Sequence, residues 1–220
     1  IILGYVRWRA KKMLGRLYSE YVFEFRPRIL GWFIRKLYNS KNINIARGFS
    51  CDTAPRIIIS RDSSLSIGEN VHMRSNVEIR GHEKSKIKID KNVRIDRGVR
   101  LLSANGSNLF IGADTSIGLY SVFNGGDNIH IGNYCLISGF VYIQTSMHKH
   151  KKGQYIKKQG YDHSPITVDN DVWLGAHSVI MPGCEIAEGS IIGSNAVVTK
   201  SIKSNSIVAG VPAKLLKNRL

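Results

Sequence analysis

Residues 166–201 read ITVDND VWLGAH SVIMPG CEIAEG SIIGSN AVVTKS, six consecutive hexads with an aliphatic residue at the third position of each hexad. A period of six fits neither the 3.6-residue repeat of an α-helix nor the 3.5-residue repeat of a coiled coil. The first and third residues of a short strand point to one face, and Gly, Asn or Asp can then form a turn. The stretch therefore predicts short strands separated by tight turns.

Twelve further hexads precede this stretch, in four groups of three that begin at Leu65. Insertions of two or four residues follow every third hexad, and a longer break occupies residues 144–165. Three hexads make one triangular coil of 18 residues, with the insertions at one corner. Each coil buries its apolar stripe by stacking on the next, about 4.8 Å away. The sequence predicts an all-β fold, a parallel β-helix over 49–210, with the repeat clearest over 57–200.

The chain is strongly basic, and its charge is unevenly spread. It has 220 residues and a net charge of +16. Residues 1–48 hold eleven Lys and Arg but two Glu, so +9 of that charge lies there (eleven minus two). Such an excess favours anionic partners, namely acidic lipid, phosphorylated ligand or acidic polysaccharide. We do not expect nucleic acid, because no binding motif is recognised and no aromatic platform accompanies the basic residues.

Cysteine content and hydropathy indicate the cellular compartment in which the protein functions. Its three cysteines form no CxxC pair, which favours a reducing compartment. We recognise no signal peptide, although the chain begins at Ile1, and no apolar run approaches the roughly 20 residues of a transmembrane helix. We therefore expect a cytoplasmic protein, either free or peripheral at the inner face of the cell membrane.

The N-terminal segment, 1–48, is predicted to be α-helical, basic and amphipathic. Apolar residues recur at helical spacing over 2–25, Pro27 is expected to break the pattern, and a second helix is expected over about 28–38. Two interpretations are open: residues 1–38 bind a membrane surface, or they cap the open edge of the first coil. Residues 211–220 are predicted to form a basic C-terminal tail.

The segment from Val141 to Leu216 contains five landmarks: VYIQTSMH, SPITV, DVWLGAHSVIMPGCEI, GSIIGSNAVVTKSI and SIVAGVPAKLLK. In order and spacing it resembles the hexapeptide-repeat, left-handed β-helix superfamily, in the branch of galactoside, maltose, nodulation-factor and capsule or O-antigen O-acetyltransferases. The resemblance implies a left-handed coil and a homotrimer with active sites between neighbours. It also implies acetyl transfer from acetyl-CoA to a saccharide hydroxyl, in capsule, O-antigen or exopolysaccharide biosynthesis.

His148 follows VYIQTSM at the position of the family's catalytic histidine. The resemblance implies that its imidazole takes the proton of the attacking hydroxyl, without an acyl-enzyme. His150, two residues on, is the alternative base or an acceptor contact. The region around Gly175 is a candidate for the donor to the oxyanion.

The remaining site residues also follow from the resemblance. Ala176 and Ser194 match the pantetheine contacts, Thr199 and Lys200 the adenosine-phosphate end, and Lys214 and Lys217 the CoA phosphates. Asp127 or Asn124, in FNGGDN, would hold the acceptor sugar, with Trp173 beside the groove. An ordinary Asx turn at Asp127, corner packing by Trp173 and a solvated basic C-terminus are the competing interpretations.

Three other functions are weighed against this one. An N-acetyltransferase acting on an amino-sugar nucleotide shares the fold and the donor. A metal-dependent hydratase would need a zinc site from His130, His148, His150 and His177; we expect no metal. A non-catalytic scaffold would not bind acetyl-CoA. The expected acceptor is a saccharide, and a lipid-linked or an anionic glycan would account for the basic charge.

Overall fold

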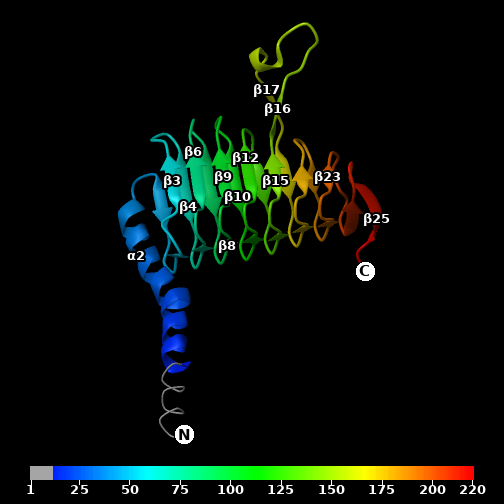
Figure 1. The fold of residues 1–220 in the computed structure, drawn as a ribbon. Coiled ribbons are helices and arrows are strands. Elements are labelled where there is room, and N and C mark those ends of the chain that lie inside the picture. Colours follow the sequence, from blue (N-terminus) through cyan, green and yellow to red (C-terminus); the bar gives the residue numbers. More distant parts are fainter. Residues whose placement is uncertain (1–11) are drawn as a thin grey trace.

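The computed structural model describes residues 12–220 and shows seven stacked coils, each built from three short parallel strands (Figure 1). The coils form a three-sided prism, and each side is one sheet. Face A contains β1 (Ile43–Ile45), β4 (Ser64–Ile67), β7 (Lys86–Ile89), β10 (Asn108–Ile111), β13 (Ile129–Ile131), β18 (Ile166–Val168) and β21 (Glu185–Ile186).

The other two faces repeat the arrangement. Face B contains β2 (Ser50–Cys51), β5 (His72–Met73), β8 (Arg94–Ile95), β11 (Ser116–Ile117), β14 (Leu136–Ile137), β19 (Trp173–Leu174), β22 (Ile191–Ile192), β24 (Ser206–Ala209) and β25 (Lys214–Asn218). Face C contains β3 (Arg56–Ile59), β6 (Glu78–Gly81), β9 (Arg100–Ser103), β12 (Val122–Gly125), β15 (Tyr142–Gln144), β20 (Val179–Ile180) and β23 (Val197–Val198). The predicted parallel β-helix is confirmed, and its first strand begins at Ile43, within the segment assigned to the N-terminal helices.

The third residue of each hexad points into the prism. On face A, Ile67, Ile89, Ile111 and Ile131 stand in register in successive coils, and all are buried. Ladders of identical aliphatic side chains thus fill the axis. The sixth residue of the hexad turns the corner in the left-handed conformation, as Asn70 does with φ 57°. Asn and Gly tolerate that conformation better than other residues, which explains why they recur there.

The helical segment at the N-terminus is continuous over the described residues. Residues 12–20 are helical, η1 (Tyr21–Phe25) is π-helical, and α2 (Arg26–Tyr38) follows directly. The predicted break at Pro27 is wrong. Pro27 is the second residue of α2 and follows a π-turn in which the Arg26 N–H bonds Tyr21 O, so the helical backbone continues through a proline that has no N–H to donate. Residues 1–11, which carry the start of the first predicted helix, lie outside the described residues.

Helix α2 covers the open end of the first coil. Pro27, Gly31 and Ile34 are buried against it, and Ile34 belongs to the hydrophobic core. A Cβ on Gly31 would collide with the carbonyl oxygen of Phe49, so the helix backbone rests directly on coil one. The capping interpretation is therefore confirmed for α2. Within residues 12–220, no helix combines the length and hydropathy needed to span a bilayer.

Replacing Gly31 by valine should lift α2 from the first coil. The collision with the Phe49 carbonyl involves rigid backbone, so we expect a cost of about 1–3 kcal/mol, typical of overpacking. Hydrogen exchange of the α2 amides should accelerate. Gly15→Val is the matched control, because a Cβ at Gly15 meets no atom within 4 Å. Equal exchange rates in the two variants would contradict this account of the cap.

The predicted C-terminal tail closes the other end of the prism. Strand β25 pairs antiparallel with β24, so Lys214 lies opposite Ala209 and Lys217 opposite Ile207. Arg219 then reaches back to Asp171, with Nη1 2.7 Å from Oδ2. The exposed edge of the last coil is thereby covered.

Candidate active site

The break in the repeat forms a β-hairpin arm that stands off the prism (Figure 1). We call residues 144–165 the arm; it contains β16 (Ser146–His148), η2 (Ile156–Lys158) and β17 (Tyr161–His163). The two strands pair antiparallel, and the Gln159 side chain closes the tip through bonds to the backbone of Lys151 and Gln154. The arm leaves the prism at the corner between faces C and A, after β15 in the fifth coil.

His148 ends β16 and is exposed, with its ring against that of Tyr161 at a centroid distance of 4.3 Å. Within residues 12–220 no hydrogen bond occupies either of its ring nitrogens. The ring thus contacts Tyr161 at a tilt of 36° while both nitrogens remain open to a ligand. His150 is held differently: its Nδ1 lies 3.1 Å from the His148 carbonyl oxygen. That bond puts the proton on Nδ1 and leaves Nε2 as an acceptor.

The foot of the arm is anchored over the FNGGDN turn of the fourth coil. Ser146 Oγ lies 2.8 Å from His163 Nδ1, and a Cβ on Gly126 would strike both side chains. Gly126 is therefore needed for the close approach of the arm. The approach of His163 to Gly126 could not be predicted from sequence spacing, because the two residues are 37 positions apart in the chain.

The two acceptor candidates lie beside this foot. Asn124 stands on β12 in register with Gln144, the first residue of the arm, and is half-buried. Asp127 Oδ1 accepts the N–H of Asn128, the next residue, at 2.7 Å. An Asx turn would instead bond the N–H two residues on, so this contact is local but is not that turn. One Asp127 oxygen is thus used locally, and a role of the other in binding sugar stays a prediction.

Several residues predicted to bind acetyl-CoA, the acetyl donor, form a row in the last coils, where faces B and C meet. We call Gly175, Ala176, Ser194 and Lys214 the donor edge. A Cβ on Gly175 would lie 2.6 Å from Ser194 N, so only glycine lets these coils stack here. The Gly175 N–H bonds Ile192 O and is not free to stabilise an oxyanion. The Ala176 and Ser194 amides, in contrast, donate to no acceptor within residues 12–220, and both residues are at least partly exposed.

The other predicted donor contacts do not all join this row. Thr199 and Lys200 follow β23, at the corner between faces C and A from which the arm also leaves. Lys217 lies farther along β25. Thr199, Lys200 and Lys217 are exposed, as is Lys214. On one chain the predicted site residues are therefore spread over the arm and its foot, the donor edge, face B and the last coil's C–A corner.

An exposed aromatic row, which the hexad pattern did not predict, flanks the donor edge. Tyr120, Phe140 and His177 stack at the B–C corner of successive coils, with centroid distances of 5.4 and 4.7 Å. Each occupies the left-handed corner position that Asn or Gly usually takes. Trp173, on face B, is 48% exposed and donates Nε1–H to Ser138 Oγ at 3.1 Å, so it is not buried in corner packing.

The four histidines considered as zinc ligands do not lie close together. His130 stacks on Phe110 on face A, His177 stacks on Phe140 at the B–C corner, and His148 and His150 lie on the arm. No group of three metal-ligating side chains occurs among the described residues. The cysteines are core residues: burial raises the pKa of Cys51 to about 12 and also raises the pKa of Cys135 and Cys184.

Comparison with known proteins agrees with this architecture. Residues 165–200 match the bacterial transferase hexapeptide (six repeats) family. Over 117 residues the chain is 36% identical to the galactoside O-acetyltransferase of Escherichia coli K12, covering 51% of this chain and 55% of that protein. The chain thus spans about half the length of the curated relatives that it matches first.

Two solved structures show the same fold. The polySia-specific acetyltransferase NeuO superposes with a TM-score of 0.55 at 26% identity, covering 81% of this chain and 86% of NeuO. A mutant of AntD, an N-acyltransferase from Bacillus cereus in complex with dTDP and coenzyme A, gives a TM-score of 0.56 at 22% identity, covering 76% and 82%. The coils and these matches show that the chain is similar to bacterial hexapeptide-repeat acyltransferases.

Proposed function

We propose that the protein transfers acetyl from acetyl-CoA to a hydroxyl group of a saccharide, with His148 as general base. The observation that carries the proposal is the arm, which presents an imidazole with both nitrogens unoccupied by any described residue. The similarity to a galactoside O-acetyltransferase and to NeuO supports the reaction class.

The chemistry is a direct displacement. As the sugar oxygen attacks the thioester carbonyl carbon, the His148 imidazole accepts the hydroxyl proton, since a neutral alcohol is a weak nucleophile. The negative charge that forms on the carbonyl oxygen needs a hydrogen-bond donor, and the free Ala176 and Ser194 amides are the candidates. The carbon–sulfur bond then breaks, and the imidazolium returns the proton to the departing CoA thiolate.

We propose that a second copy of the chain completes the site. The arm stands off its own prism in Figure 1, whereas the donor edge lies at a different corner. We propose a homotrimer in which the arm of one chain lies against the donor edge of its neighbour. Closed threefold symmetry would give three equivalent sites.

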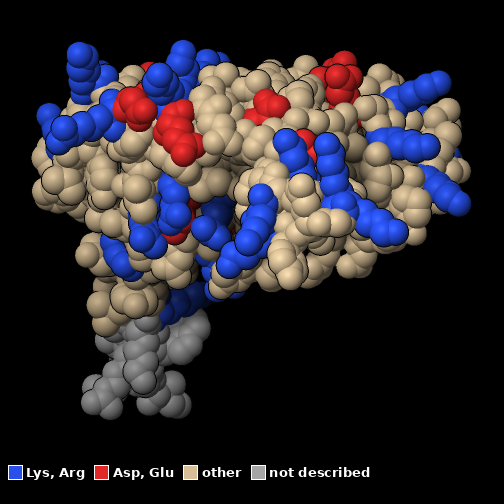
Figure 2. All heavy atoms as spheres, turned by 90° about the horizontal axis from the view of Figure 1, so that it is seen from above, with Lys and Arg blue, Asp and Glu red and all other residues tan. Residues whose placement is uncertain are grey.

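We further propose that the acceptor is an anionic or lipid-linked glycan used in polysaccharide biosynthesis. Lys and Arg far outnumber Asp and Glu on the face seen in Figure 2. Helical residues 12–38 also leave many apolar side chains exposed, including Phe23, Phe25 and Phe33. Their mixture with basic residues suits the surface of an acidic membrane. Three free, buried thiols suit the reducing side of that membrane.

The test is thiol release from acetyl-CoA across a panel of saccharides. The panel should contain neutral sugars, an acidic polysaccharide and an amino-sugar nucleotide. We expect turnover with a hydroxyl acceptor. Turnover with the amino-sugar nucleotide alone would favour the N-acetyltransferase, and a protein that binds no acetyl-CoA would refute both.

A further inference from the structure

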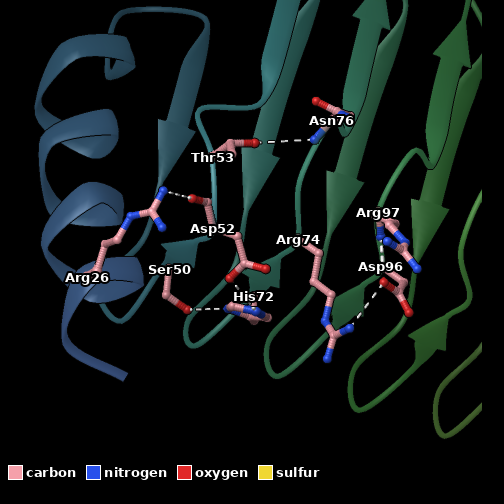
Figure 3. Close-up of polar contacts among 9 residues, drawn as sticks. All are labelled: Arg26, Ser50, Asp52, Thr53, His72, Arg74, Asn76, Asp96 and Arg97. Atoms are coloured by element: carbon pink, nitrogen blue, oxygen red, sulfur yellow. Dashed lines mark hydrogen bonds and ion pairs between the residues drawn. The ribbon is translucent and has the colours of Figure 1, made fainter. Parts of the chain in front are cut away.

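A cleft of about 560 Å³ lies between the N-terminal helix and face B of the early coils. The helix lies beside the first coil, whereas the arm leaves the prism after the fifth coil (Figure 1). One wall is helical and includes Phe23, Glu24 and Arg28, and the other is formed by β2, β5, β8 and β11. The Arg26 guanidinium donates to the Asp52 carbonyl oxygen at 3.3 Å and ties the two walls together (Figure 3). None of the residues assigned to acetyl transfer lines this cleft.

The floor of the cleft is a column of polar side chains in strand register. Ser50, His72, Arg94 and Ser116 stand one above the other on successive coils. These positions point outward, where the corresponding residues of later coils are apolar: Leu136, Trp173 and Ile191. The change from polar to apolar along one column marks the early coils as a separate surface.

His72 is held in a fixed pose and contributes little charge. Its Nδ1 lies 2.9 Å from Ser50 Oγ, and its Nε2 lies 3.6 Å from Asp52 Oδ1 (Figure 3). Burial is the main cause that lowers its pKa, and the nearby Arg74 and Arg94 add to the effect while Asp52 and Asp96 oppose it. The ring is therefore largely neutral at neutral pH, and it serves to orient Ser50.

Three arginines line the cleft, and two of them lack a carboxylate partner among the described residues. The third, Arg74, pairs with Asp96, with Arg74 Nη1 3.7 Å from Asp96 Oδ1. Arg28 on the helix and Arg94 on β8 form no ion pair with any residue of 12–220, and both are exposed in the cleft. Glu24 is the one acidic lining residue that has no ion-pair partner among the described residues. Two unpaired arginines and one unpaired glutamate leave the lining with a net positive charge. A second hollow of about 610 Å³ shares Arg28 and adds Arg35.

The geometry points to a phosphate-binding site in this cleft, which nothing in the proposed acetyl transfer requires. Guanidinium groups from opposite walls would contact different oxygens of one phosphate group, and Arg pairs with phosphate in a bidentate manner. The hydroxyls of Ser50 and Ser116 and the amide of Asn70 line the same space and supply neutral donors. The phosphate would come from a lipid headgroup or from a soluble phosphorylated compound.

Calorimetric titration with inorganic pyrophosphate tests the site directly. We expect saturable binding to the full-length protein, weakened at least tenfold by Arg94→Gln and by Arg28→Gln. Arg97→Gln is the matched control: Arg97 is exposed on the same coil, three residues from Arg94, but does not line the cleft. The absence of saturable binding, or an equal loss in Arg97→Gln, would overturn the proposal.

Vesicle sedimentation identifies the source of the phosphate. Vesicles of phosphatidylcholine and phosphatidic acid should bind the wild type. If a lipid headgroup occupies the cleft, pyrophosphate will release the protein and Arg94→Gln will bind more weakly than Arg97→Gln. If the natural ligand is soluble, the two variants will sediment equally while only Arg94→Gln loses pyrophosphate. The acetyl-transfer rate in solution should be unchanged in both variants, so failure of this site is distinguishable from failure of the proposed function.

Discussion

Replacing His148 by alanine lowers kcat for acetyl transfer to a hydroxyl by about 10²–10⁴-fold, the range that a positioned general base contributes. The KM for acetyl-CoA should change little, because the ring lies on the arm and not on the donor edge. Thiol release under saturating substrates measures the effect.

His130→Ala is the control, because His130 is an exposed histidine on face A, stacked on Phe110. His150→Ala should be measured beside it, since the His150 ring also presents a free Nε2. A large loss in His150→Ala with none in His148→Ala would move the base two residues along the arm. Wild-type turnover in both variants would refute acetyl transfer by this arm.

Replacing Phe123 by alanine has the largest expected effect on stability. Phe123 is fully buried and is the largest such side chain on the axis of the prism. Its loss leaves a cavity between coils that strand pairing holds in place, so we expect a cost of about 3–5 kcal/mol. Guanidinium unfolding at one fixed protein concentration measures it, because assembly contributes to apparent stability.

Phe110→Ala is the matched control for Phe123→Ala. Phe110 lies on the neighbouring face of the same coil, but it points outward and is half-buried. Its removal should cost much less than that of Phe123. Equal losses from the two positions would contradict the inward register of the third hexad position.

The fold could be predicted because the hexad period is a local property. An inward aliphatic residue and a turn residue recur in every unit, so each coil repeats the same information. The break at 144–165 was equally visible as a loss of that period. The break expected at Pro27 was wrong because a proline in the first turn of a helix is compatible with a preceding π-turn, which sequence spacing does not reveal.

The site could be predicted only in part, because its contacts join distant residues. His148 was recognised from its neighbours in the chain, but the packing of His163 over Gly126 depends on where the arm folds back. The occupied amide of Gly175 and the free amide of Ala176 likewise follow from coil stacking. The Tyr120, Phe140 and His177 row was missed because aromatic residues are unusual at left-handed corners.

The most direct test of the central claim is complementation between two inactive variants. His148→Ala removes the base from the arm, and Ser194→Trp should block the donor edge, where Ser194 is exposed. Each variant alone should show no measurable acetyl transfer at a low concentration of acetyl-CoA. If the arm of one chain meets the donor edge of another, random mixed trimers will regain roughly a quarter of the wild-type sites. If mixed assemblies stay silent while the wild type is active, arm and donor edge belong to one chain, and the account is contradicted.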